Sequence, residues 1–301
     1  MSDARATETW PALPLAEWKP TLDTLHMWTQ IVGKVRLVQS PLVNHWWNVP
    51  LYVTPRGLTT SIIPHGSRSF EIDFDFIDHL LRVRTGEGTT RTLSLAPRSV
   101  ADFHRELMAT LDGLDLPVSI HGTPDEVDDP IPFALDETHT SYEAEYAQRH
   151  WRILVQADRV LKEFRSRFIG KCSPVHFFWG SFDLAVTRFS GRRAPPMPDA
   201  DAITREGYSH EVISHGFWAG SGNIAEPAFY SYTAPQPDRL PQAAIRPAKA
   251  FYNPETTGFI LPYEVVRKAA DPDAVLLEFL QSTYEAGANL AKWDRATLER
   301  S

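Results

Sequence analysis

Apolar residues recur at steps of three and four in four segments of the chain, which is the spacing of one face of an α-helix. Ser99 and Asp271 stand where two of these helices need an N-cap, and Thr140 with Glu143 forms a capping-box pattern before a third. The pattern therefore predicts helices over 21–39, 98–112, 141–169 and 272–293.

Aromatic and β-branched residues predominate between these helices, which is typical of β-strands. In Phe70–Phe76 the alternation is strict, because the four apolar residues share one face while Glu71, Asp73 and Asp75 share the other. The other predicted strands are Trp46–Thr54, Arg91–Leu95, Phe177–Phe189, His210–Trp218, Phe229–Thr233 and Gly258–Pro262. Helices and strands in this arrangement predict an α+β fold.

The order of predicted elements occurs twice along the chain. Each half consists of a helix, three strands and a helix, and corresponding strands open at His45 and His176, each followed by two aromatic residues. We interpret this as an internal duplication that gives two pseudo-twofold-related helix–β-sheet–helix repeats forming one compact unit. The alternative is a coincidence between two aromatic strands.

The duplication sets the predicted boundaries. The repeats are expected over 18–121 and 140–293, joined by an acidic, proline-containing connector over 122–139 that we expect to be exposed. The second repeat carries two proline-rich insertions, 190–207 and 234–256. Long segments of this kind either cover a binding site or decorate a surface, and both alternatives stay open.

Composition narrows the function classes. The 301 residues include 38 acidic and 30 basic side chains, and the net charge of -8 disfavours a general nucleic-acid partner. No apolar run is long enough to predict a membrane partner or a membrane span, and the first ten residues lack the apolar core of a signal peptide, so a cytoplasmic protein is expected. The single cysteine, Cys172, excludes an internal disulfide and is either an apolar filler or a nucleophile.

The candidate catalytic residues are two carboxylates and two histidines at matching places in the repeats. Asp75 precedes His79 by four residues, as Glu211 precedes His215. Residues four apart on a strand are separated by roughly 13 Å, so neither couple can act on one atom. If the two sheets meet around the pseudo-twofold axis, each carboxylate instead approaches the histidine of the other repeat. Such pairs are general bases or structural ion pairs.

Other histidines are candidate metal ligands. His45, His176 and His210, together with a carboxylate, have the ligand types of a divalent zinc, iron or manganese site. His210 and His215 are five residues apart in a predicted strand, so they do not form a zinc-protease motif, which needs a spacing of four on a helix.

The candidate substrate-binding residues are cationic and aromatic. Arg56 and Arg188 each stand near the end of a predicted strand and are suited to an anionic ligand, although surface ion pairs are the commoner role of arginine. Trp47, Phe178 and Trp218 are suited to an aromatic ligand, or are simply part of the core.

These residues support two hypotheses of different classes. The first is an enzyme acting on a small aromatic or anionic molecule in a cleft between the repeats, with a histidine–carboxylate or divalent-metal site. The second is a non-catalytic protein that binds or senses a small molecule in an aromatic-lined pocket. Neither a phosphate-binding loop nor a dinucleotide fingerprint occurs in the sequence.

Several motifs resemble an uncharacterised bacterial family, the domain of unknown function DUF5996. They are Leu25–Lys34, Asn44–Trp47, Gly57–Ser61, Tyr208–Glu211, Gly216–Trp218 and Phe279–Glu285. The resemblance covers about 10–293 and implies a bacterial source and a single full-length unit. It implies no activity and no catalytic residues.

Overall fold

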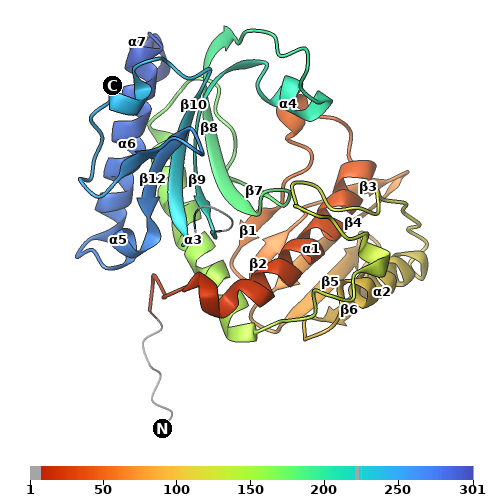
Figure 1. Cartoon of the computed structure of the whole chain (residues 1–301). Helices are drawn as coiled ribbons and strands as arrows, with labels where there is room; N and C mark the ends of the chain where they lie inside the picture. The colour runs from red at the N-terminus through yellow and green to blue at the C-terminus, as the bar shows by residue number, and fades with distance from the viewer. Residues whose placement is uncertain (1–7, 221–223, 225, 301) are drawn as a thin grey trace.

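The computed structural model describes residues 8–220, 224 and 226–300, and it contains two antiparallel β-sheets that each pack against helices (Figure 1). The first sheet has the order β1-β2-β4-β5-β6, with β3 paired to β4. Its strands are β1 (Tyr52–Thr54), β2 (Gly57–Thr59), β3 (Ile63–His65), β4 (Arg68–Asp75), β5 (Leu80–Thr85) and β6 (Thr90–Ser94). The mixed helix and strand content confirms the predicted class.

The second sheet has the order β11-β12-β10-β9-β8-β7. Its strands are β7 (His176–Phe178), β8 (Asp183–Arg193), β9 (His210–Trp218), β10 (Ala228–Ala234), β11 (Phe251–Asn253) and β12 (Gly258–Pro262). Two of these, β9 and β12, have the predicted bounds. In both sheets neighbouring strands are mostly consecutive in the sequence, so tight turns join most of them.

Two long helices pack on each sheet. The first sheet contacts α1 (Leu15–Gln39) and α2 (Val100–Asp112), and the second contacts α3 (Ala144–Ser166) and α6 (Pro272–Leu290). The shorter helical elements are η1 (Asn44–Trp46), η2 (Phe133–Leu135), α4 (Ala202–Gly207), η3 (Leu240–Gln242), α5 (Tyr263–Arg267) and α7 (Arg295–Leu298). The apolar faces of the long helices and the sheets form one continuous core.

Two of the predicted helix starts are confirmed by their caps. The Ser99 hydroxyl accepts a hydrogen bond from the backbone N–H of Asp102 (3.1 Å), and α6 is capped in the same way by Asp271. The capping box at Thr140 is wrong, because α3 begins at Ala144 and no side chain caps it. The prediction for α1 is too short, since the helix continues through Pro20 and its buried face extends to Trp18 and Leu15.

Two predicted strands are interrupted by left-handed backbone. His45 and Trp46 have φ angles of 59° and 60°, so the chain forms η1 there and the strand predicted from Trp46 begins only at β1. The strand predicted over Phe177–Phe189 is divided into β7 and β8, because Phe182, with φ 55°, ends a tight turn after Gly180. Each of these two turns lies in an aromatic segment of the sequence that resembles a continuous strand.

The two sheets meet along the edge strands β1 and β7. The backbone N–H of Leu51 donates to the carbonyl of Phe177 (2.9 Å), and the N–H of Phe177 donates to the carbonyl of Leu51 (2.9 Å). The indole N–H of Trp179 donates a further hydrogen bond across this junction, here called the seam, to the carbonyl of Val49 (2.8 Å). This pairing brings the chain before β1 next to the turn after β7.

The connector and the insertions are more structured than predicted. Phe133 and Asp136 of the connector are fully buried, so it is not simply an exposed linker. The first insertion, 190–207, contains the end of β8 and all of α4, whereas the second, 234–256, contains η3 and the edge strand β11. The two insertions therefore lie at different places and do not form one cover.

Gly33 lets α1 pack against Trp179 without a side chain in between. A Cβ atom at this position would collide with the indole ring. We therefore predict that Gly33→Ala lowers the free energy of unfolding by about 1–3 kcal/mol, the usual cost of overpacking, despite the better helix propensity of alanine. Urea denaturation measures the change. The matched control is Gly122→Ala, where a Cβ meets nothing within 4 Å, and an equal effect of the two substitutions would contradict this account.

Candidate functional site

The first pair of predicted catalytic residues lies at the turn between β4 and β5. Asp75 accepts hydrogen bonds from Nε of Arg56 (2.7 Å) and Nε of Arg82 (3.2 Å). His79 has a left-handed φ of 53°, and its Nδ1 lies 2.9 Å from the hydroxyl of Tyr142. The chain thus turns after Asp75, and the spacing argument that assumed a continuous strand does not apply to this pair.

The second pair lies on the helix-facing side of the other sheet. Glu211 accepts a hydrogen bond from Nη2 of Arg192 (2.6 Å), and His215 is fully buried with its ring 4.8 Å from that of Phe164 in α3. The carboxylate–histidine pairs expected between the repeats are therefore not formed. Strand alternation explains the position of His215, because β9 turns its odd-numbered residues toward the helices.

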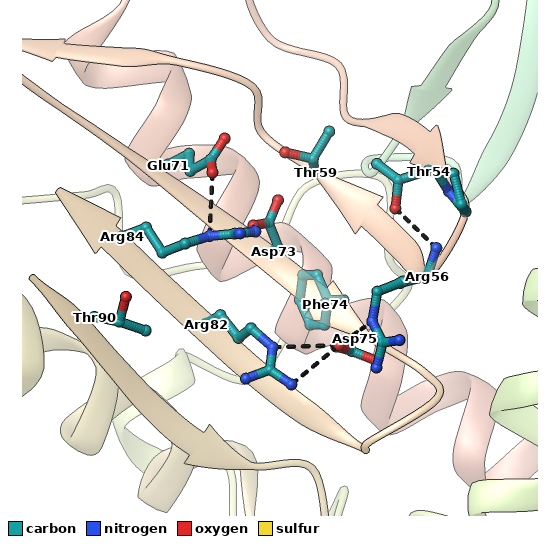
Figure 2. Close-up of a pocket in the computed structure, with 11 residues that line it drawn as sticks. Thr54, Arg56, Thr59, Glu71, Asp73, Phe74, Asp75, Arg82, Arg84 and Thr90 are labelled. Atoms are coloured by element: carbon teal, nitrogen blue, oxygen red, sulfur yellow. Dashed lines mark hydrogen bonds and ion pairs between the residues drawn. The ribbon is translucent and has the colours of Figure 1, made fainter. Parts of the chain in front are cut away.

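The face of the first sheet that points away from its helices forms a hollow of about 660 Å³, here called the polar hollow (Figure 2). It is lined by Thr54, Pro55, Arg56, Thr59, Glu71, Asp73, Phe74, Asp75, Arg82, Arg84 and Thr90. Arg84 pairs with Glu71 (3.1 Å) and with Asp73, while Asp75 pairs with Arg56 and Arg82. The charges neutralise one another, so little electrostatic attraction is left for a ligand.

The other predicted arginine and one predicted tryptophan line neither of the two hollows described here. Arg188 is buried with its guanidinium carbon 3.5 Å from the ring centroid of Phe164, and it donates to the carbonyl of that residue. Burial lowers the pKa of Arg188 to about 10. Trp218 ends β9 and lines neither the polar hollow nor the pocket described below.

The candidate metal ligands are not gathered around one point. The rings of His45 and His210 are 5.6 Å apart between centroids, but His176 is buried beneath Trp47. Over residues 8–220, 224 and 226–300, no three His, Cys, Asp or Glu side chains are placed to hold a metal ion. Burial also raises the pKa of Cys172 to about 11, which disfavours a thiolate nucleophile.

A second hollow, of about 570 Å³, lies between the two halves and is here called the interlobe pocket. Its floor is the face of the second sheet that points away from the helices, and its walls come from η1, the connector and α4. The aromatic lining residues are Trp46, Trp47, Phe178, Trp179, Phe189, Tyr208, Tyr230 and Tyr232. The acidic lining residues are Asp125, Glu126, Asp183 and Asp201. Trp47, Phe178 and His45 are the sequence candidates that this pocket brings together.

Asp183 is the central polar group of the floor. The hydroxyl of Ser181 donates to its Oδ1 (2.6 Å), and the hydroxyl of Tyr230 donates to its Oδ2. Burial raises the pKa of Asp183, against the opposing effect of these two hydrogen bonds. Burial and the adjacent carboxylate in turn raise the pKa of Tyr230 well above its ordinary value.

The tyrosines extend this hydrogen-bonded floor. The rings of Tyr230 and Tyr232 stack with their centroids 6.1 Å apart, and the hydroxyl groups of Tyr232 and Tyr208 are 2.9 Å apart. Gly216 lies opposite Tyr230 in the sheet register, and a Cβ there would collide with the phenol ring of Tyr230. The absence of a side chain at Gly216 therefore allows Tyr230 to lie flat and reach Asp183.

Glu126 approaches the same region from the connector. Its Oε1 would lie 2.6 Å from a Cβ placed on Gly180, so the carboxylate packs against the turn that leads into Asp183. Loss of hydration raises the pKa of Glu126, and the charges of Asp183, Asp125 and Asp201 raise it further. The two acids thus come from elements far apart in the sequence.

Helix α1 fixes the connector and the turn around the pocket. Lys34, which is buried, donates to Oδ2 of Asp125 (2.5 Å), and the side-chain amide of Gln30 exchanges hydrogen bonds with the backbone of Asp125 (both 2.8 Å). His26 Nε2 lies 2.7 Å from the carbonyl of Gly180 and must donate to it. The acids are consequently placed by a rigid element rather than by a free loop.

His45 joins η1 to α4 at the opposite wall. Its Nδ1 faces the carbonyl oxygens of Glu206 (3.1 Å) and Gly207 (3.2 Å), so Nδ1 carries the proton. Nε2 is then free to accept from the ammonium of Lys171 (2.6 Å). Burial, followed by the charge of Lys171, lowers the pKa of His45 and keeps the ring neutral.

Sequence reasoning missed Asp183, Tyr230 and Glu126. The turn that exposes Asp183 lies inside an aromatic run, and the acidic character of the connector was interpreted as a sign of exposure. Only the alternation of Tyr230 and Tyr232 with apolar neighbours could have indicated a polar face on the second sheet.

The sequence model of a family of unknown function, DUF5996, matches residues 10–300, and the chain therefore belongs to this family. No protein with a curated description and no solved structure matches it. Among the helices that the structure describes, none is long and apolar enough to cross a lipid bilayer.

The ion pairs of Asp75 make a prediction about stability. Burial opposes ionisation of this side chain, but hydrogen bonds from Arg56, the backbone N–H groups of Asp78 and Ile77, and Arg82 outweigh it and lower its pKa from 3.8 to about 2. Because the folded pKa is depressed, the stabilisation is present above about pH 4 and is lost as the pH falls toward 2.

We predict that Asp75→Asn lowers the free energy of unfolding at pH 7 by about 1–2 kcal/mol, since solvent screens the half-exposed Arg56. Thermal denaturation at pH 7 and near pH 2 measures the difference, which should be much smaller at the lower pH. In the control variant Glu71→Gln, which removes a more exposed carboxylate of the same hollow, the change should stay within about 0.5 kcal/mol. A pH-independent effect of Asp75→Asn would contradict the electrostatic origin.

Proposed function

We propose that the protein is an enzyme that acts on a small molecule in the interlobe pocket by proton transfer, with Asp183 and Glu126 as the reacting groups and Tyr230 as the residue that positions Asp183. The observation that carries the proposal is the buried carboxylate of Asp183 in the floor of a hollow, with hydrogen bonds from Ser181 and Tyr230. A titratable group with a raised pKa in a concave, aromatic-lined site is typical of acid–base catalysis.

The two acids suit complementary roles. Glu126 and Asp183 flank the turn at Gly180 from different elements, so a substrate between them would meet one carboxyl group from the connector and one from the floor. Raised pKa values favour retention of a proton, and each group can therefore act as an acid in one step and as a base in the reverse step. Tyr230 would hold Asp183 in place and donate to its ionised form.

The expected catalytic groups were carboxylate–histidine pairs, whereas the proposed site pairs a carboxylate with a tyrosine. The hydrogen bonds and ion pairs of Asp75, His79 and Glu211 engage them outside the interlobe pocket, and His215 lies under α3, so none of the four is assigned a part in it. Trp47 and Phe178 keep their expected role as ligand contacts, and His45, which was expected to bind a metal, is proposed as a further ligand contact. A metal-dependent version receives no support from the described side chains.

The second candidate function is a protein that binds or senses a small molecule without converting it. The specific observation in its favour is the wall of aromatic rings, including Trp46, Trp47 and Trp179, which supplies affinity without chemistry. Both functions use the same pocket, and they differ in whether the bound molecule is recovered unchanged.

The pseudo-twofold duplication is part of the proposal as well. Each half has a leading helix, an antiparallel sheet and a closing helix, and the first strands of the two sheets pair at Leu51 and Phe177. The outer faces of the two sheets line different hollows, however, so an ancestral duplication would not by itself create a shared site.

We predict that purified protein incubated with a bacterial metabolite extract depletes at least one small molecule, and that Asp183→Asn slows this depletion by about 10²–10⁴-fold, the usual contribution of a general acid or base. Tyr230→Phe, which removes only the hydroxyl that donates to Asp183, should have a smaller effect in the same direction. Mass spectrometry of the extract over time measures both.

The control for this experiment is Glu71→Gln, which alters a carboxylate of the polar hollow and should leave the rate unchanged. Circular dichroism and thermal melting show whether each variant is folded. A molecule that is retained by the protein but never consumed would support the binding function instead, and equal turnover by wild type and Asp183→Asn would overturn the assignment of Asp183.

A further inference from the structure

We propose that the ligand of the interlobe pocket is an organic ammonium ion, a molecule with a protonated or quaternary amine attached to an apolar body. The inference deepens the proposed function, because it concerns the same pocket, but it requires only binding and not turnover. It rests on the charge of the lining, on the aromatic walls and on two ammonium groups that the protein itself places against those walls.

The charge of the lining favours a cation. Four carboxylates and no lysine or arginine line the pocket within the described residues. Two of these carboxylates have structural partners, since Asp125 pairs with Lys34 (2.5 Å) and Asp201 caps α4 through the backbone N–H groups of residues 203 and 204 (2.8 and 3.0 Å). Asp183 accepts hydrogen bonds from the hydroxyl groups of Ser181 and Tyr230, and neither it nor Glu126 pairs with a described lysine or arginine, so in their ionised forms these two carboxylates would attract a cationic ligand.

The aromatic walls already bind ammonium groups. The Nζ atom of Lys171 lies 5.3 Å from the ring centroid of Trp47 and 4.9 Å from that of Phe189, and it donates to His45. On the other side of the pocket, Nζ of Lys34 lies 5.7 Å from the ring centroid of Trp179. A ligand ammonium would use the same combination of ring faces and hydrogen-bond acceptors.

An anionic ligand fits these surroundings poorly. The sequence favoured an anion because of Arg56 and Arg188, but neither guanidinium lines the interlobe pocket. An anion there would face Asp183 and Glu126, while the nearby ammonium groups of Lys171 and Lys34 are already engaged by His45 and Asp125. Like charges at short range repel strongly in a partly desolvated site. A cation instead gains attraction from both carboxylates and keeps its apolar body against the rings.

The test uses choline as the probe and 3,3-dimethylbutan-1-ol as its uncharged counterpart of the same shape. Isothermal titration of the full chain, together with quenching of tryptophan fluorescence, measures both affinities, and benzoate serves as the anionic probe. We expect choline to bind at least about tenfold more tightly than the alcohol, and benzoate to bind most weakly. Choline affinity should fall as the pH is lowered, because protonation of Glu126 and Asp183 removes the attracting charge.

Three variants locate the site. Trp47→Leu and Glu126→Gln should each weaken choline binding by about tenfold, and thermal melting checks that each variant is folded. Glu71→Gln in the polar hollow is the matched control and should have no effect.

Two results would overturn the ammonium assignment, and they have different consequences for the pocket. If the alcohol or benzoate binds as tightly as choline and Trp47→Leu abolishes that binding, the ligand class is wrong while the pocket stands as the functional site. If choline binds equally well to Trp47→Leu and Glu126→Gln, or if no probe of any charge binds, the ammonium assignment fails, and only the turnover experiment on Asp183 can then sustain the pocket.

Discussion

Two backbone hydrogen bonds between Leu51 and Phe177 join the two sheets and thereby position the interlobe pocket. Each bond occupies an edge strand that would otherwise expose unpaired polar groups, and together they hold the two sheets side by side. The segment before Leu51 is the left-handed turn at His45 and Trp46, and the segment after Phe177 is the turn that leads into Asp183. The seam therefore places an aromatic turn of one half above an acidic floor of the other.

The two hollows of the molecule show how the same residue types produce different electrostatic environments. In the polar hollow each acid faces an arginine across neighbouring strands, and the pKa of Asp75 is lowered as a result. In the interlobe pocket Asp183 accepts hydrogen bonds from two hydroxyl groups instead, and its pKa is raised by burial. A carboxylate in the first setting contributes to stability, whereas one in the second is available for chemistry or for a ligand.

Much of the fold could be predicted from the sequence, because its signals are local. The cap at Ser99 and the alternation in Phe70–Phe76 depend on neighbouring residues only, and the structure has the helix and the strand where they were expected. The site depends instead on contacts between distant segments, such as Glu126 against Gly180. The turn at Phe182 is hidden because its φ of 55° is unusual for phenylalanine, and without this turn Asp183 appears to lie within a strand.

Gly216 illustrates how a position without a side chain can control the chemistry of a distant atom. The phenol ring of Tyr230 occupies the space that a larger residue at position 216 would need, and that ring carries the hydroxyl that reaches Asp183. A Cβ at this position would also meet the backbone carbonyl oxygen of Leu184 in the neighbouring strand, so the close approach of the two strands depends on the same glycine. The polar floor of the interlobe pocket thus depends on a residue that carries no functional group.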